Sequence, residues 1–253
     1  MDLLNSELSP DFIRLFIAGV DLYDSSCSKE AKVYFIDKDC GYYLKIAPQN
    51  RLKREFEMTQ FFHRKGLSAK VVIYISEERD WLLTEKIQGN NGIALKYLDH
   101  PKKLCDLFSE RLSLLHIMEY SDCPIQNHSE LYLNNLDYNK CNRELFPDNW
   151  GYKSAEQAWN IVKSKGHLLQ NDTLLHGDYC LPNIILDDWC FSGFVDLDCA
   201  GVGDKHIDLF WGIWTLNFNL KTNKYKDRFL DAYGRDRIDE ERLNIICAFE
   251  VFV

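Results

Sequence analysis

The stretch Leu174–Asp198 reads LLHGDYCLPNIILDDWCFSGFVDLD, and it decides the fold of the chain. Asn183 follows Asp178 by five positions, and Asp196 follows Asn183 by thirteen. Two short apolar runs with a polar pair between them separate Asn183 from Asp196, and this pattern predicts a tight β-hairpin. A loop followed by a hairpin would gather two carboxylates and one side-chain amide.

These three polar residues have the chemistry that a phosphoryl-transfer site requires. A carboxylate orients the acceptor hydroxyl and takes its proton, while carboxylate and amide oxygens bind the Mg²⁺ that neutralises the phosphates. Each residue taken singly would be interpreted as a turn residue or a strand-end cap. Their joint spacing, H-x-D-x-x-x-x-N and then an aspartate after a hairpin, matches the catalytic groups of protein kinases.

The segment from His176 to Asp198 resembles the H-G-D-x-x-x-x-N…D signature of the aminoglycoside phosphotransferases, antibiotic-resistance enzymes with a protein-kinase-like fold. The glycine after His176, where protein kinases carry arginine, separates that group from the protein kinases. The resemblance implies that Asp178 is the catalytic base and that Asn183 and Asp196 hold Mg²⁺. It also implies an α+β, protein-kinase-like two-lobe fold, with a small antiparallel-sheet N-lobe and a larger, mostly helical C-lobe.

Other parts of the chain carry weaker marks of the same family. Gly203-Asp204 followed by Asp208-Leu209 resembles the family's G-x-x-D helix start, and Leu115-His116 resembles the end of its first large helix. The tail Ala232–Val253 resembles the closing helix of the 3′-phosphotransferase branch. Leu197-Asp198-Cys199 departs from the pattern, because the 3′ enzymes usually have Leu-Gly-Arg there, with the arginine beside the substrate.

The apolar pattern changes character near residue 87. Strand patterns dominate before it and helical patterns after it. We expect residues 1–87 to form a nucleotide-binding lobe and residues 88–253 a catalytic and substrate-binding lobe. The expected strands are Lys32–Ile36, Tyr42–Ile46, Val71–Ser76 and Trp81–Ile87, and the expected helices are Arg51–Arg64, Ala155–Lys165, one that begins at Pro101 and one that begins at Ile207.

A kinase-like site holds the α and β phosphates with a strand lysine, which a helix glutamate fixes in place. Lys45 lies on the second strand of the first predicted hairpin, and Glu55 lies on the helix that follows. The family resemblance assigns its ion pair to these two residues. Glu57 is the alternative partner, but two positions along a helix it would face a different side.

The remaining nucleotide contacts are expected from two further segments. Ser28 lies in a serine-containing loop without glycine, and in similar enzymes such a loop covers the phosphates. Thr84, Lys86 and Ile87 form the expected hinge, whose backbone groups would pair with the purine. Because backbone groups make these contacts, ATP and GTP remain equally open as the phosphate donor.

The net charge of −9 is distributed unevenly along the chain. Residues 1–87 carry 13 basic and 14 acidic side chains, so nearly all of the negative charge belongs to the remainder. This charge would attract a polycationic acceptor such as an aminoglycoside, and it disfavours binding to the phosphate backbone of nucleic acids. Glu250 is the leading substrate candidate, because a carboxylate in the apolar run CAFEVFV needs a reason. The other expected substrate contacts are Asp148, Glu156, Asp204 and the terminal Val253.

Composition narrows the class of protein further. With 46% hydrophobic and 27% charged residues, the chain has the composition of an ordinary globular protein. No apolar run approaches the ~20 residues of a membrane-spanning helix, and the N-terminus lacks a secretion-signal pattern, so we expect no membrane partner and a cytoplasmic location. The nine cysteines are scattered without a C-x-x-C pair, which indicates reduced thiols with structural roles.

We therefore expect a nucleoside-triphosphate-dependent phosphotransferase that modifies an aminoglycoside hydroxyl, most simply the 3′, and so confers resistance. One alternative is a kinase of the same fold for another hydroxylated molecule, such as choline, a macrolide or a sugar. The other is a nucleotide-binding module without catalysis. The intact set of catalytic residues disfavours this last alternative, since a silent relative would be expected to lose the base or a metal ligand.

Overall fold

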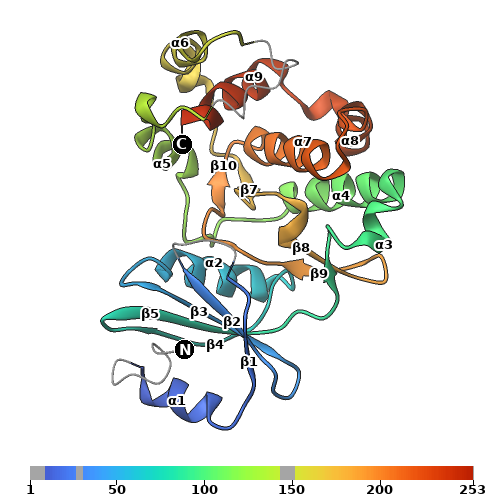
Figure 1. Cartoon of the computed structure of the whole chain (residues 1–253). Coiled ribbons are helices and arrows are strands. Elements are labelled where there is room, and N and C mark those ends of the chain that lie inside the picture. The colour runs from blue at the N-terminus through green and yellow to red at the C-terminus, as the bar shows by residue number, and fades with distance from the viewer. Residues whose placement is uncertain (1–8, 27–30, 143–151, 253) are drawn as a thin grey trace. The chain divides into compact units, whose positions relative to one another are not determined.

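The computed structural model describes residues 9–26, 31–142 and 152–252. The chain forms two compact units, Met1–Gly89 with Ser192–Asp198 and Asn90–Phe191 with Cys199–Val253, which we call the N-terminal and C-terminal units (Figure 1). No helix within the described ranges is long and apolar enough to cross a membrane. The cysteines that the structure describes are all free thiols.

A five-stranded antiparallel sheet forms the body of the N-terminal unit, with the strand order β1-β2-β3-β5-β4 (Figure 1). A turn at Asp39 and Gly41, both at positive φ, joins β2 to β3, as the Asp-Cys-Gly sequence predicts. The strands are β1 (Leu22–Asp24), β2 (Lys32–Ile36), β3 (Tyr42–Pro48), β4 (Val71–Ser76) and β5 (Arg79–Glu85).

Side chains alternate between the two faces of this sheet, and one helix covers each face (Figure 1). Leu44 and Ile46 of β3 pack with α1 (Asp11–Ile17), while Ala47 packs on the opposite face beside the start of α2 (Lys53–Arg64). Lys45 has the same parity as Ala47, so the strand period directs it toward α2. The sequence analysis did not anticipate α1 or β1, because both are short and α1 has no capping side chain.

A buried carboxylate fixes the beginning of α2. Asp80 of β5 is fully buried, and it accepts hydrogen bonds from the Leu52 N–H at 2.8 Å and the Ser76 hydroxyl at 2.6 Å. Burial opposes ionisation, but these hydrogen bonds outweigh it and hold the pKa of Asp80 below its ordinary value of 3.8. The helix that presents Glu55 is therefore tied to the central sheet at its first turn.

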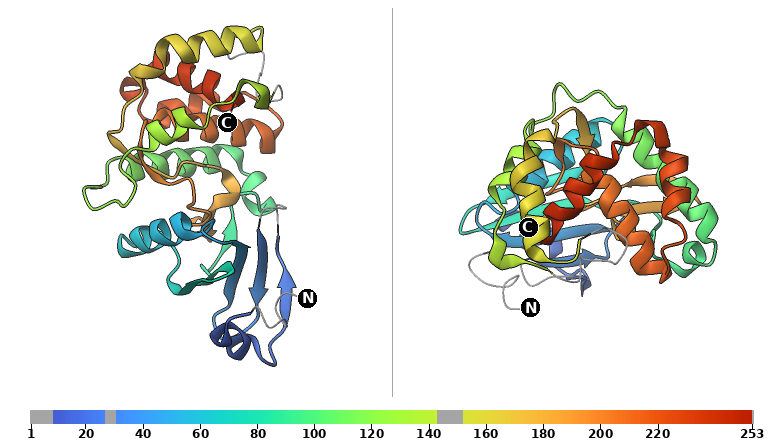
Figure 2. Two further views of the ribbon diagram at one scale, coloured as in Figure 1. Left: turned by 90° about the vertical axis from the view of Figure 1, so that its left-hand side faces the viewer. Right: turned by 90° about the horizontal axis from the view of Figure 1, so that it is seen from above.

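The C-terminal unit is mainly helical, and its described residues also contain four short strands and the first two residues of a fifth, β9. The helix α4 opens with proline at its first turn, and Leu104, Phe108, Leu112 and Leu115 form its buried face, as their spacing predicts. Figure 2 shows α6 and α9 side by side. The helices are α3 (Leu95–Leu98), α4 (Pro101–His116), α5 (His128–Asn134), α6 (Ala155–Lys165), α7 (His206–Leu220), α8 (Lys226–Tyr233) and α9 (Glu240–Phe249), with 3₁₀ turns η1 (Tyr138–Lys140), η4 (Gly166–Leu168), η5 (Leu181–Asn183), η6 (Arg235–Arg237) and η7 (Glu250–Phe252).

We call residues 176–183 the catalytic loop. The hairpin predicted after this loop is present in the structure. A turn at Asp188 and Trp189, both at positive φ, connects β8 to β9, which is the geometry of a tight hairpin turn. The division between the two units falls within β9, so Asp196, which follows it, belongs to the N-terminal unit. The strands are β6 (Asn90–Asn91), β7 (Thr173–Leu175), β8 (Ile184–Asp187), β9 (Cys190–Phe194) and β10 (Gly201–Gly203).

Replacing Asp80 tests the tie between α2 and the sheet. We expect Asp80→Ala to lower the free energy of unfolding by about 2 kcal/mol, because it leaves the Leu52 and Ser76 donors unsatisfied in the interior. Since the folded pKa is depressed, this difference should be full at pH 7 and shrink as the pH falls below about 4. Urea unfolding of both proteins at pH 7 and pH 3.5 measures it, and equal midpoints at pH 7 would contradict the assignment.

Candidate active site

Lys45, Glu55 and Asp196 form a connected ionic group in the N-terminal unit. The Lys45 Nζ lies 2.7 Å from Glu55 Oε2 and 2.8 Å from Asp196 Oδ1. Asp196 has a φ of 60°, an uncommon conformation for a residue other than glycine, and its side chain is half exposed. The lysine therefore bridges one buried and one accessible carboxylate.

Burial and charge act in opposite directions on this group. Burial lowers the pKa of Lys45, but the charges of Glu55 and Asp196 outweigh it, so the net shift is upward and the ammonium stays charged. Burial raises the pKa of Glu55 to about 7, although Lys45 opposes the shift. Glu57, the alternative partner, lies on the surface of α2, with its carboxylate 4.0 Å from Lys53.

Asp178 and Asn183 lie together in the C-terminal unit, at the two ends of the catalytic loop. The Asn183 amide donates to Asp178 Oδ2 at 2.8 Å and to the Asp178 carbonyl at 3.0 Å. Asn183 is buried at the end of η5, whereas Asp178 is partly exposed. Because the amide nitrogen is used within the loop, the Asn183 Oδ1 is the atom of this side chain suited to a cation.

The position of Gly177 in the H-G-D motif requires glycine for a steric reason. Gly177 has a φ of 83°, and a Cβ at this position would lie 1.9 Å from the carbonyl oxygen of Cys199. The arginine that protein kinases carry here would therefore collide with the backbone. Tyr179 then anchors the loop, because its ring stacks on Phe108 of α4 and its hydroxyl donates to the Phe108 carbonyl at 2.7 Å.

The buried carboxylate of Asp208, on α7, holds the backbone of the same loop. Asp208 Oδ1 accepts from the Gly177 N–H at 2.8 Å, and Oδ2 accepts from the His176 N–H at 2.8 Å. The His116 imidazole, on α4, approaches Oδ2 with its Nε2 at 3.1 Å. Asp208 thus fixes the two residues that precede Asp178.

His116 continues the network to Tyr233. Its Nδ1 lies 2.8 Å from the Tyr233 hydroxyl, which stays protonated because burial raises the pKa of Tyr233 to about 12. Burial lowers the pKa of His116, so its ring is neutral. A carboxylate can only accept, so Nε2–H donates to Asp208 and Nδ1 accepts from Tyr233.

The predicted nucleotide contacts outside the ionic group have mixed placements. Thr84 is paired within the sheet opposite Tyr43, and the Lys86 N–H donates to the Gly41 carbonyl at 2.9 Å. The Lys86 ammonium lies over the Phe35 ring. Ile87 follows the end of β5, and Ser28 lies outside the described residues.

Glu250 begins η7 and is almost fully buried. It accepts hydrogen bonds from the Tyr132 hydroxyl and from the Trp211 indole N–H. Burial raises the pKa of Glu250 to about 8, and the charge of Asp178 adds to the shift while the two hydrogen bonds oppose it. The reason for a carboxylate in this apolar tail is therefore a set of internal partners.

Asp204 needs correction as a substrate candidate. It is fully buried and accepts from the Gln170 and His206 N–H groups, each at 3.0 Å, with the Arg242 guanidinium 3.5 Å away. Burial opposes ionisation, but the His206 contacts hold the pKa of Asp204 below its ordinary value. Its oxygens join three segments of the unit, so an acceptor cannot reach them.

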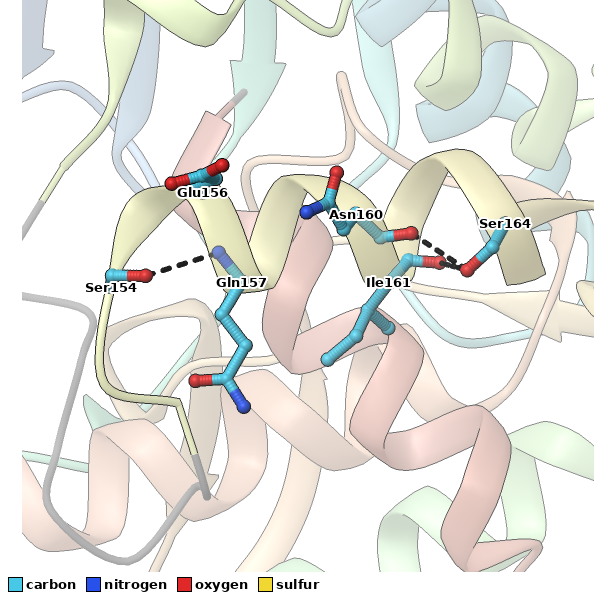
Figure 3. Close-up of a pocket in the computed structure, with 6 residues that line it drawn as sticks. All are labelled: Ser154, Glu156, Gln157, Asn160, Ile161 and Ser164. Carbon is cyan, nitrogen blue, oxygen red and sulfur yellow. Dashed lines mark hydrogen bonds between the residues drawn. The ribbon is translucent and has the colours of Figure 1, made fainter.

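The other expected substrate contacts are Glu156, Asp148 and the terminal Val253. Glu156 lies in the first turn of α6, beside an open depression of about 420 Å³ along that helix (Figure 3). The depression is lined by Ser154, Glu156, Gln157, Asn160, Ile161 and Ser164, and none of these residues belongs to the catalytic loop. Asp148 and Val253 lie outside the described residues.

The residues expected to hold Mg²⁺ have suitable donors. Asp196 offers a half-exposed carboxylate and Asn183 an amide oxygen, and hard oxygen donors of this kind suit Mg²⁺. Within the described ranges, no cluster of three or more His, Cys, Asp or Glu side chains could hold a metal.

The sequence analysis noted Asp208 and His116 only as parts of family patterns and did not assign them a role. A signal was present for Asp208, since a carboxylate in the otherwise apolar run HIDLFWGIW requires a buried partner. Tyr233 and Trp211 carried no comparable signal, because an aromatic residue at helical spacing usually belongs to the core.

Comparison with known proteins places these features in a family. A model of the phosphotransferase enzyme family matches residues 28–245. A probable aminoglycoside 3′-phosphotransferase of Lactococcus lactis is 53% identical over 98% of this chain and 97% of its own length. The crystal structure of aminoglycoside 3′-phosphotransferase of type VIII superposes with a TM-score of 0.72 and 20% identity, over 96% of this chain and 98% of that one.

A second solved structure, an aminoglycoside phosphotransferase from Streptomyces rimosus in complex with ADP and streptomycin, has a TM-score of 0.71 and 18% identity, and covers 99% of this chain and 98% of that one. These matches confirm the predicted α+β, kinase-like fold. With the family model matched over most of its length and a relative 53% identical, this chain belongs to the phosphotransferase enzyme family that includes the aminoglycoside 3′-phosphotransferases.

Proposed function

We propose that this chain transfers the γ-phosphate of a nucleoside triphosphate to a hydroxyl group of an aminoglycoside, the 3′-hydroxyl being the best supported. The observation that carries the proposal is the hydrogen-bonded pair of Asp178 and Asn183, on a loop whose backbone Asp208 fixes. The name of the Lactococcus lactis relative supports the acceptor and the position. The acidic excess of the C-terminal unit supports a cationic acceptor.

The N-terminal unit supplies the groups for the phosphate donor. The Lys45 ammonium, held by Glu55, would bind the α and β phosphates, and Ile87 would present backbone groups to the purine. Lys45 is also paired with Asp196 at 2.8 Å, so a bound phosphate would compete for the same ammonium. The choice between ATP and GTP would rest on the backbone near Ile87, whereas Ser28 would contact the phosphates that both nucleotides share.

Asn183 and Asp196 would hold Mg²⁺, which when bound neutralises the negative charge of the transferring phosphates. The Lys45 ammonium would add further positive charge to the groups that bind the phosphates. Phosphoryl transfer depends on position and electrostatics more than on covalent steps, so fixed side chains are the main contribution of the protein.

Asp178 would act on the acceptor. Its Oδ2 accepts from the Asn183 amide, and we assign its Oδ1 to the acceptor hydroxyl. The carboxylate would orient that hydroxyl for in-line attack on the γ-phosphorus. It would take the hydroxyl proton as the new P–O bond forms and the bond between the γ-phosphorus and the leaving nucleoside diphosphate breaks. Asp208 and His116 hold the backbone that positions this carboxylate.

Nucleotide turnover with a panel of acceptors tests the proposal. We expect kanamycin or neomycin to stimulate release of ADP from ATP, or of GDP from GTP, in the presence of Mg²⁺, with the phosphorylated antibiotic identified by mass spectrometry. Choline, a macrolide and a neutral sugar serve as competing acceptors. Stimulation by one of these alone would favour a different small-molecule kinase, and no stimulation by any acceptor would favour a silent nucleotide-binding module.

Asp178→Ala provides the matched catalytic control. We expect at least a 100-fold loss of kcat with the nucleotide Kd unchanged within about twofold, because this side chain acts on the acceptor and not on the nucleotide. Product formation by the variant at the rate of the parent protein would exclude Asp178 as the base.

Asp208→Asn tests whether the buried network positions the catalytic loop. An asparagine can accept with one atom only, so it cannot serve the Gly177 and His176 N–H groups together, and we expect kcat to fall about tenfold or more. The nucleotide Kd should not change. Asp204→Asn is the control, since Asp204 is equally buried near the start of α7 but accepts hydrogen bonds from Gln170 and His206, which lie outside the loop. If the two variants lose kcat equally at a temperature where both are folded, general destabilisation explains the effect.

The raised pKa of Glu55 predicts a pH dependence of nucleotide binding. Above pH 7 the carboxylate is charged and holds Lys45, whereas below pH 7 it becomes neutral, so the nucleotide Kd should rise as the pH falls from 8 to 6. Titration with a fluorescent nucleotide measures this change. Glu55→Gln should bind weakly and lack the dependence, and Glu57→Gln should retain the profile of the parent protein. A persistent profile in Glu55→Gln would assign the titration to another group.

A further inference from the structure

Three aromatic side chains form a row on one side of α7, with Trp211 edge-on to Trp214 and Trp214 stacked on Phe218. Trp211, Trp214 and Phe218 are spaced by three and four residues, which places them on one face of the helix. The ring centroids of Trp211 and Trp214 lie 5.5 Å apart, and those of Trp214 and Phe218 lie 4.9 Å apart with nearly parallel planes. We call these three residues the aromatic ladder.

The ladder is accessible although the rest of α7 is packed. Phe218 is 55% exposed, and both tryptophans are partly exposed. The other side of the helix packs against α4, α8, α9 and η5, and supplies buried residues such as Leu209 and Ile213. A continuous row of large aromatic rings at the surface is a common mark of a binding site.

One end of the ladder is connected to the acceptor side of the catalytic site. The Trp211 indole N–H donates to Glu250. The negative charge of Asp178 is one of the causes that raise the pKa of Glu250. The residue after Trp214, Thr215, accepts from the Leu181 N–H of the catalytic loop at 3.1 Å. The helix that carries the ladder therefore packs against η5, which belongs to the same loop as the proposed base.

The other end of the ladder already binds an ammonium group. The Lys221 Nζ lies 4.3 Å from the centre of the Phe218 ring. Aromatic faces attract cations through the ring quadrupole, and tryptophan does so best among the side chains. The geometry at Phe218 shows that a primary ammonium can reach the exposed face of this ladder.

We propose that the aromatic ladder is a binding platform for the ammonium groups of the acceptor, and that Glu250 fixes its first ring. This inference rests on the proposed function and gives a reason for its preference for cationic acceptors. An acceptor with amino groups beyond its reacting ring gains cation–π contacts along α7, whereas a neutral sugar does not. Glu250 acts here by positioning Trp211 and not by direct contact with the acceptor, which its burial prevents.

The proposed role of the ladder can be tested by replacing an aromatic side chain with leucine, which removes the aromatic ring but keeps an apolar side chain. Trp214→Leu and Phe218→Leu should each weaken binding of kanamycin and neomycin by about three- to tenfold in isothermal titration calorimetry. Trp214→Phe, which keeps a ring, should stay within about twofold of the parent protein. Phe12→Leu is the matched control, because Phe12 is also a helix-borne aromatic, 43% exposed and stacked on Phe16.

The nucleotide Kd should be equal in all of these proteins, since the proposed phosphate-binding groups, Lys45 and Glu55, belong to β3 and α2. Antibiotic binding to the Leu variants at the parent affinity would overturn the ladder while leaving the proposed function intact. Absence of antibiotic binding to the parent protein would overturn both. Sedimentation velocity adds one more outcome: a dimer that Phe218→Leu converts to a monomer with unchanged antibiotic affinity would make the ladder a subunit interface, against the proposal.

Discussion

The carboxylate of Asp208 accepts the backbone N–H groups of His176 and Gly177, and the arrangement of the catalytic loop depends on these hydrogen bonds. A carboxylate sealed in an apolar interior is unfavourable unless donors surround it, so the helix and the loop each stabilise the other. His116 supplies a further donor from α4. The buried charge therefore fixes the backbone next to Asp178 through two long-range contacts.

A different constraint organises the N-terminal unit. The strand period places Lys45 on the face of the sheet that α2 covers, and the Asp80 carboxylate holds the first turn of that helix. Glu55 then meets Lys45 at 2.7 Å in a largely buried environment, which raises the pKa of the glutamate to about 7. The unit thus pairs the Lys45 ammonium with a carboxyl whose pKa lies near neutrality.

The acidic side chains of the C-terminal unit do not all serve the same purpose. Asp204 and Glu250 are buried and serve internal partners, so they do not form an acidic surface for a cation. The aromatic ladder offers another means of attracting ammonium groups, one that does not require ionised carboxylates. Long-range attraction by the remaining acidic side chains and short-range recognition by ring faces are compatible contributions to one acceptor site.

Local sequence determined the elements whose signals are short in range: the β-hairpin after the catalytic loop, the apolar face of α4, and the spacing of Asp178, Asn183 and Asp196. It also indicated the family, because the H-G-D motif reflects a steric requirement at Gly177. Only the tertiary structure decided that His116 and Tyr233 belong to the catalytic-loop network, that Asp204 is inaccessible, and that Trp211 joins Glu250. His116 and Asp208 are 92 residues apart. The pattern of a single segment does not encode such contacts, since they depend on how separate helices pack.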